Sequence, residues 1–184
     1  AADAVAVLLY TSGTTGRSKG AMLSHDNLAA NADALHQAWG YQPGDVLLHA
    51  LPIFHAHGLF VGLHGALYNG SGMLWLPRFE LDAVLRLLPR ATLFMGVPTY
   101  YVRLLEDARL DAGTCARVRL FVSGSAPLLA ETHRAFLERT GHVILERYGM
   151  SETVMLTSNP YHGERRPGTV GTPLPGVEVR LRDD

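Results

Sequence analysis

Short apolar runs alternate with longer amphipathic segments along this chain, and the alternation is what most restricts the folds open to it. Strand-like runs occur at residues 45–51, 73–76, 92–97, 118–122 and 143–147. Helical patterns separate them at residues 24–39, 58–68, 80–88, 99–108 and 129–140. Such alternation predicts an α/β fold in which a mostly parallel sheet is flanked by helices on both faces. Ligands of these sheets bind outside the carboxyl ends of the strands.

A polar loop at residues 11–20 follows the apolar run 5–9, which has the pattern of a buried strand. The loop sequence, TSGTTGRSKG, combines hydroxyls, glycines and two cations. Glycines let backbone N–H groups approach an anion, hydroxyls add short donors, and Lys19 adds a compact positive charge. A polyphosphate cradle is predicted, although a flexible polar surface hairpin has the same composition. A Walker loop is excluded because Ser18, rather than Gly-Lys-Ser/Thr, stands five positions after Gly13.

Two more polar loops follow strand-like runs. Residues 123–127 (SGSAP) are small and leave room for a flat ring against the backbone, although a plain strand-to-helix turn explains them nearly as well. Residues 148–153 (YGMSET) offer Tyr148 for stacking, the Ser151 hydroxyl for a phosphate, and Glu152 as an oxygen ligand for magnesium. A helix start with an acid in its first turn is the alternative for this segment. We expect all three loops to converge on one edge of the sheet.

Four histidines lie close together in the sequence, at positions 49, 55, 57 and 64. An extended His55-Ala56-His57 segment would direct both imidazole rings to one face, so a zinc site is one interpretation of the cluster. No Cys, Asp or Glu lies among these histidines to complete the zinc shell nearby, which weighs against that interpretation.

Three segments together resemble motifs of the adenylate-forming superfamily: residues 11–20, residues 148–153, and the turn-rich residues 168–176 (GTVGTPLPG). This superfamily includes acyl-CoA synthetases, luciferases and the adenylation domains of peptide synthetases. Ser18 stands where most members have proline, a difference that affects loop stiffness more than ligand chemistry. The resemblance covers nearly the whole chain. It implies that residues 1–184 are a fragment, the central part of a larger AMP-binding N-terminal domain, with the C-terminal catalytic-lysine domain absent.

The resemblance also assigns a nucleotide site with ATP and Mg²⁺ as its ligands. The expected phosphate contacts are Thr11, Ser12, Gly13, Thr14, Thr15, Gly16 and Lys19. The expected contacts to the adenosine and its phosphate are Gly124, Ser125, Ala126, Pro127, Tyr148, Gly149, Met150 and Ser151. Glu152 and Thr11 are the expected metal ligands, and the expected catalytic residues are Lys19, His55 and Glu152.

Residues 51–58 (LPIFHAHG) match the floor of the superfamily's acyl pocket, with His55 at the carboxyl end of the substrate. Arg147 matches a position that lines this pocket. A guanidinium there would shorten the pocket and offer paired donors to a second carboxylate. A structural ion pair with neighbouring acids is the alternative role for Arg147. The competing candidates for the carboxylate contact are Arg103, Arg119 and Arg134.

Within the superfamily, residues 146–149 (ERYG), 123–127 and 51–58 look most like the malonyl-CoA synthetases, also called malonate–CoA ligases. The resemblance implies an ATP-dependent acid–thiol ligase that activates malonate, or methylmalonate, as an acyl-AMP and transfers it to CoA. A small dicarboxylic acid and CoA are therefore the expected partners. Three alternatives share the nucleotide motifs: another acyl-CoA synthetase, a peptide-synthetase adenylation domain, and a non-catalytic nucleotide-binding module.

Charge and composition indicate which kinds of partner the protein is not expected to bind and in which cellular compartment it is expected. The formal net charge of −1 gives no electrostatic basis for binding nucleic acid or an anionic membrane. No apolar run approaches the roughly 20 residues of a membrane span. Cys115 is the single cysteine, so no disulfide can form within the chain, as is usual in a reducing compartment. We therefore expect a cytoplasmic protein.

Overall fold

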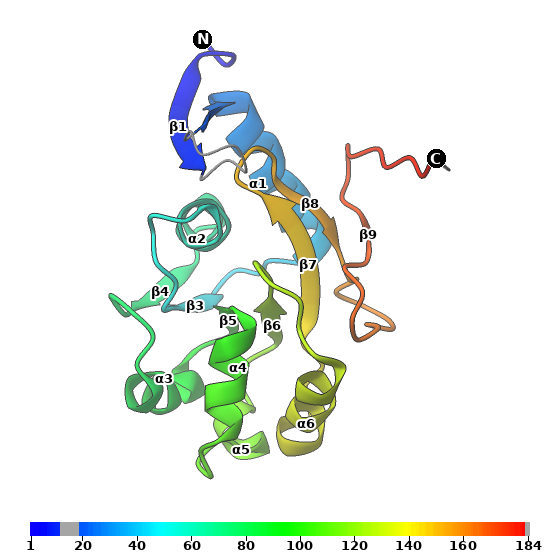
Figure 1. Cartoon of the computed structure of the whole chain (residues 1–184). Coiled ribbons are helices and arrows are strands. Elements are labelled where there is room, and N and C mark those ends of the chain that lie inside the picture. Colours follow the sequence, from blue (N-terminus) through cyan, green and yellow to red (C-terminus); the bar gives the residue numbers. More distant parts are fainter. Residues whose placement is uncertain (12–18, 183–184) are drawn as a thin grey trace.

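A seven-stranded sheet forms the centre of the computed structural model, which describes residues 1–11 and 19–182 (Figure 1). Its strand order is β4-β3-β5-β6-β7-β8-β9. The first five strands in this order pair in parallel, and β8 and β9 continue the sheet antiparallel. The strand bounds are β3 Val46–His49, β4 Gly72–Trp75, β5 Leu93–Gly96, β6 Leu120–Ser123, β7 Leu145–Met150, β8 Val154–Ser158 and β9 Thr172–Pro173. The predicted α/β fold with a mostly parallel sheet is confirmed.

Helices lie on both faces of this sheet, as the alternation predicted (Figure 1). Ser24 caps the longest of them: its hydroxyl accepts from the Asn27 N–H at 3.1 Å, while the Asn27 side chain accepts from the Ser24 N–H at 3.0 Å. The helix bounds are α1 His25–Trp39, η1 His57–His64, α2 Gly65–Tyr68, α3 Leu81–Leu87, η2 Leu88–Arg90, α4 Pro98–Leu105, α5 Ala112–Cys115 and α6 Ala130–Thr140. The η1 segment is a π-helix that runs directly into α2.

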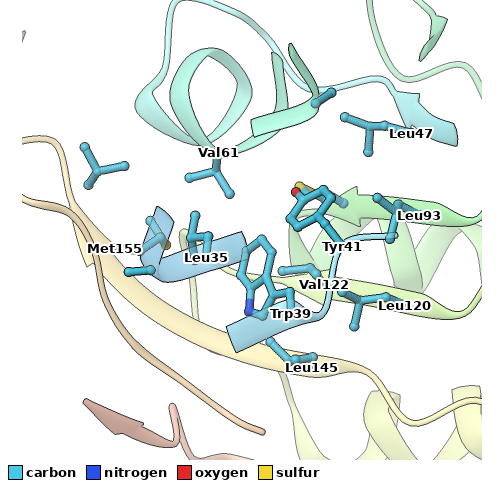
Figure 2. Packing of buried hydrophobic residues seen from close by; sticks show 14 of the residues in the cluster. Leu35, Trp39, Tyr41, Leu47, Val61, Leu93, Leu120, Val122, Leu145 and Met155 are labelled. Atoms are coloured by element: carbon cyan, nitrogen blue, oxygen red, sulfur yellow. The ribbon is translucent and has the colours of Figure 1, made fainter. Parts of the chain in front are cut away.

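The two-residue period of the strands divides the core into two clusters. Leu47, Leu93 and Leu120 pack with α1, η1 and α2 on one face of the sheet, around the fully buried Trp39 (Figure 2). The next residue of each strand packs on the opposite face with α3, α4, α5 and α6; these residues are Leu48, Phe94 and Phe121. Apolar strand residues buried on both sides are the pattern of a parallel sheet covered by helices.

Residues 5–9 form a strand, as predicted, but the prediction that this strand is buried is wrong. These residues belong to β1 (Val5–Thr11), which pairs antiparallel with β2 (Lys19–Ser24) in a separate two-stranded sheet. Only one face of this ribbon meets the core. Val7 and Leu9 pack there, whereas Leu8 and Tyr10 are exposed. A short apolar run does not distinguish a strand buried on both faces from one buried on a single face.

Two other segments do not form the element that their local pattern allows: a helix start, which is the alternative for residues 148–153, and a strand at residues 177–181. Residues 148–150 continue β7 and do not begin a helix, because β8 folds back on β7 and pairs Tyr148 with Thr157. Residues 151–153 form the turn of this β7–β8 hairpin. Residues 177–181 form no strand, despite their alternating pattern. In the part of the chain that the structure describes, no helix is both long and apolar enough to cross a membrane.

Candidate active site

Two adjoining cavities lie at the carboxyl ends of the parallel strands. The first has a volume of about 440 Å³, and its lining includes the segments that follow β3, β5 and β6: Leu51, Pro52, His55, Ala56, His57, Gly58, Val97, Ser125, Arg147, Gly149, Met150, Ser151 and Met155. The second, of about 400 Å³, is lined by Ser123, Ser125, Ala126, Pro127, Glu146, Arg147, Tyr148, Gly149, Gly168 and Val170. Ser125, Arg147 and Gly149 line both cavities. We call them the 440 Å³ cavity and the 400 Å³ cavity.

The loop 123–127 and the hairpin residues 148–151 therefore meet, as expected for segments at the carboxyl ends of neighbouring parallel strands. His55 joins them because the segment that carries it leaves β3 at the same edge. Ala126, Pro127 and Tyr148 line the 400 Å³ cavity, on the other side of the shared residues.

Most of the third loop, residues 12–18, is not among the described residues. Ser12, Gly13, Thr14, Thr15 and Gly16 lie outside the described residues. The flanking Thr11 and Lys19 are paired across β1 and β2, and the Thr11 hydroxyl donates to the Lys19 carbonyl oxygen at 3.4 Å. Neither residue lines the 440 Å³ or the 400 Å³ cavity. The rule that places ligands at the carboxyl ends of parallel strands did not apply to this loop, because β1 is not part of the parallel sheet.

Glu152 is exposed at the turn of the β7–β8 hairpin, next to Ser151 of the 440 Å³ cavity. It lines a neighbouring hollow of about 350 Å³ together with Leu23 and Asn27, which lie at the end of β2 and the start of α1. One exposed carboxylate suits magnesium, which takes one or two carboxylates and completes its shell with substrate phosphates and water.

The zinc interpretation of the histidines receives no support from the structure. Ala56 begins a helical segment, so residues 55–57 are not extended. Among residues 1–11 and 19–182, no group of three or more His, Cys, Asp and Glu side chains is arranged to hold a metal ion.

Arg147 combines a buried guanidinium with a lack of partners. The residue is 4% exposed, and its Nε and Nη2 atoms have no hydrogen-bond partner among the described residues. The guanidinium packs against the backbone of Gly124, where an added Cβ would lie 2.3 Å from the Arg147 Cζ. Burial lowers the pKa of Arg147 to about 10, so the group stays charged at neutral pH. A buried, uncompensated cation favours an anion at the cavity wall.

The acid next to Arg147 is engaged elsewhere: Glu146 accepts a hydrogen bond from the Gly168 N–H at 2.9 Å. Because the described residues contain no ion pair to Arg147, the structural ion-pair alternative finds no support.

The three competing arginines are also placed away from the 440 Å³ cavity. Arg119 forms an ion pair with Asp45, with 2.9 Å between Nε and Oδ1, at the opposite edge of the sheet where β3 and β6 begin. Arg134 is exposed on α6. Arg103 is exposed on α4, with its Cζ 4.9 Å from the centre of the Phe79 ring. Arg147 alone of the four candidates lines the cavity.

A second histidine of the 51–58 segment was not predicted as a site residue. His57 is 5% exposed, and its Nδ1 lies 3.3 Å from the Ser125 hydroxyl oxygen. Burial, together with the charges of Arg147 and His49, holds the pKa of His57 well below its usual range, so the ring is neutral. No local sequence signal reveals this contact, because its two partners are 68 positions apart.

Similarity to known proteins agrees with this geometry. The family described as "AMP-binding enzyme" matches residues 1–184 of the chain. The chain belongs to the AMP-binding enzyme family.

Relatives within the AMP-binding family include ligases of malonate. The mitochondrial malonate–CoA ligase of Mus musculus is 43% identical, with 97% of this chain and 33% of the relative covered. The crystal structure of ATP-bound MatB from Rhodopseudomonas palustris superposes with a TM-score of 0.96 at 59% identity, covering all of this chain and 36% of MatB. A malonyl-CoA ligase complex with methylmalonyl-CoA and AMP has a TM-score of 0.93 at 46% identity, covering 98% of this chain and 40% of the ligase. The chain spans about a third of the length of the curated relatives it matches.

Proposed function

We propose that this chain is the central part of the N-terminal domain of an ATP-dependent malonate–CoA ligase, whose catalytic lysine belongs to a separate C-terminal domain. The enzyme would join malonate, or methylmalonate, to CoA through an acyl-AMP. Support comes from the similarity to malonate–CoA ligases and from the chemistry of the 440 Å³ cavity. The expected cytoplasmic location, and the expected absence of nucleic-acid and membrane partners, stay predictions.

The buried Arg147 guanidinium is the observation that carries the choice of substrate. Nε and Nη2 form one edge of the guanidinium, and both are buried without a hydrogen-bond partner among the described residues. A carboxylate matches such an edge with two parallel hydrogen bonds. A diacid bound in this cavity would neutralise Arg147 with one carboxylate and leave the other, near His55, to react. A monocarboxylic acid would leave the guanidinium unpaired, at a cost to binding.

In the first half-reaction, an oxygen of the free carboxylate attacks the α-phosphorus of ATP. The bond from that phosphorus to the bridging oxygen breaks, pyrophosphate leaves with the electron pair, and malonyl-AMP remains. Arg147 and His55 would hold the acid in place for this attack. Tyr148 would stack on the adenine in the 400 Å³ cavity, and Ser151 would donate to the α-phosphate.

Charge on the phosphates must be balanced during this step. Lys19 and the phosphate loop would supply positive charge and hydrogen-bond donors to the β- and γ-phosphates. Glu152, with Thr11, would hold magnesium, which supplies further positive charge to the phosphates when it is bound. In the second half-reaction the CoA thiolate attacks the carbonyl carbon of malonyl-AMP, and the bond from that carbon to the phosphate oxygen breaks to release AMP.

The substrate is tested with the complete enzyme in a pyrophosphate-exchange assay. Malonate and methylmalonate are expected to support exchange far better than acetate, butyrate, benzoate or amino acids. The Arg147→Ala variant should lose about a hundredfold or more in kcat/KM for malonate, because two hydrogen bonds to a charged group each contribute about 1.5–3 kcal/mol. Butyrate should be affected far less. Arg134→Ala, an exposed arginine on α6, is the matched control.

Each alternative has its own result in this assay. An unchanged preference for malonate in Arg147→Ala would remove Arg147 from substrate recognition. Exchange with a monocarboxylic acid or an amino acid, but not with malonate, would indicate another acyl-CoA synthetase or a peptide-synthetase adenylation domain. Binding of ATP without exchange for any acid, together with the lack of a catalytic lysine in the complete gene, would indicate a non-catalytic module.

A further inference from the structure

Ser125 has an unusual backbone conformation at the wall between the two cavities. Its φ angle is 70°, in the left-handed region, where a residue with a Cβ is disfavoured. Residues other than glycine keep such a conformation only where their surroundings determine it. Because Ser125 lines both the 440 Å³ and the 400 Å³ cavity, this strained residue belongs to the partition between them.

Contacts from two different elements fix this position. On one side, the backbone of Gly124 lies against the guanidinium of Arg147, which comes from β7. On the other side, His57 at the start of η1 approaches the Ser125 hydroxyl through Nδ1, at 3.3 Å. His57 is 5% exposed and belongs to η1, the helix that packs on the sheet through Val61. His57 is therefore placed to select one conformation of the loop.

We propose that His57 is a positioning residue that holds Ser125 in its left-handed conformation and so shapes the nucleotide cavity from the acid side. The proposal rests on the proposed function, in that it takes the 400 Å³ cavity as the adenosine site. His57 touches neither the reacting carboxylate nor the phosphate in this scheme. It acts through Ser125, whose hydroxyl is used to hold the loop and not to bind a ligand.

A serine held in this way gives opposite expectations for two small substitutions. Ser125→Ala keeps the Cβ, and with it the disfavoured left-handed backbone, but loses the hydroxyl that His57 holds. Ser125→Gly loses the same hydroxyl, but glycine adopts a positive φ without steric cost. A serine that contacted the nucleotide directly would make the two variants equally poor. The difference in AMP affinity between the Ser125→Ala and Ser125→Gly variants therefore depends only on the backbone conformation of residue 125.

The experiment measures the Kd of AMP by calorimetry on the complete enzyme, with thermal unfolding to establish that each variant is folded. We expect the Kd of the Ser125→Ala variant to exceed that of the Ser125→Gly variant about tenfold, equivalent to about 1.4 kcal/mol. His57→Leu should raise the Kd about tenfold, but by less than about threefold when Ser125→Gly is present. His57→Asn should restore binding, because its amide lies where Nδ1 was. His162→Leu, an exposed histidine, is the matched control.

Equal AMP affinities of the Ser125→Ala and Ser125→Gly variants would overturn the proposal. The same holds for a His57→Leu effect that persists in full on the Ser125→Gly background. If His57→Leu does not fold, His57→Gln replaces it, because its amide lies where Nε2 was and leaves the Ser125 hydroxyl without its partner. AMP binding needs no malonate, so these results are independent of the acid panel. A complete enzyme that shows no pyrophosphate exchange with malonate would refute the proposed function, but the AMP-binding test of His57 and Ser125 would still be valid.

Discussion

In the proposed malonate–CoA ligase, an alanine at position 124 is expected to remove the preference for malonate by moving Arg147. A Cβ built on Gly124 lies 2.3 Å from the Arg147 Cζ and 2.5 Å from both Nε and Nη1. Non-bonded heavy atoms approach to about 3.5 Å at best, so the guanidinium must shift by about 1 Å or the loop must yield. Arg147 is 4% exposed, and the free space beside it is that of the two cavities it lines, so a displaced guanidinium moves into these cavities and away from its original position.

The expected size of the effect follows from this displacement. A 1 Å misplacement of a positioning group costs about a hundredfold in rate, and overpacking itself costs about 1–3 kcal/mol of stability. In a pyrophosphate-exchange assay of the complete enzyme, Gly124→Ala should lower kcat/KM for malonate about a hundredfold while butyrate changes far less. Gly113→Ala in α5 is the matched control, because its added Cβ meets only ordinary contacts, the nearest atom being 3.4 Å away.

A double variant separates this explanation from a general disturbance of the loop. When Arg147 is already alanine, the clash with the guanidinium no longer exists. Gly124→Ala should then add almost nothing to the loss caused by Arg147→Ala alone. A Gly124→Ala enzyme with the wild-type ratio of malonate to butyrate activity would refute the reasoning. So would a further large loss in the double variant.

Two further predictions concern stability. Asp45 is buried, which by itself raises its pKa, but hydrogen bonds from Arg119, the Gln42 N–H and Thr92 hold the pKa below its ordinary value. The ionised Asp45 therefore stabilises the folded state fully above about pH 4, and this stabilisation is lost as the pH falls through the lower pKa that Asp45 has in the folded state. The Asp45→Asn variant should show a smaller fall of the urea midpoint between about pH 5 and pH 3 than the wild type. An unchanged fall would contradict this prediction. Gly149→Ala places a Cβ 1.8 Å from the Val154 carbonyl oxygen and should lower the stability of the complete enzyme by about 2 kcal/mol or more, so an unchanged Tm would contradict it.

The central sheet could be predicted from the sequence because its local signals agree with each other. Each strand of the parallel part is a short apolar run, and each is separated from the next by a segment with helical spacing. The sequence offers Ser24 or Asp26 as the cap of α1, and the structure shows that Ser24 caps it, with Asn27 completing a capping box. The convergence of the loops after β6 and β7 then follows from parallel pairing alone.

What could not be predicted depends on contacts between distant parts of the chain. The run 5–9 has the composition of a central strand, and only its pairing with β2 makes it a half-exposed ribbon. The hairpin turn at 151–153 has the composition of a helix start, because serine and glutamate suit both. The contact between His57 and Ser125 joins two motifs that carry no sign of each other in the sequence.

One local pattern in β7 links the two cavities. Parallel pairing sets Ser123 opposite Glu146, so the next residues along, Gly124 and Arg147, lie side by side at the end of the ladder. Successive strand residues face opposite sides of a sheet. Glu146 and Tyr148 accordingly line only the 400 Å³ cavity, whereas Arg147 between them reaches the 440 Å³ cavity as well.

The consecutive residues 146–148 therefore border both cavities across the thickness of one strand. In the proposed enzyme, Tyr148 meets the adenine while Arg147 meets the acid, and no flexible linker separates the two contacts. Such an arrangement brings the acid close to the α-phosphate without any movement of β7. It also explains why residue 124 must be glycine in this chain: a guanidinium at 147 occupies the space that a Cβ on the neighbouring strand end would need.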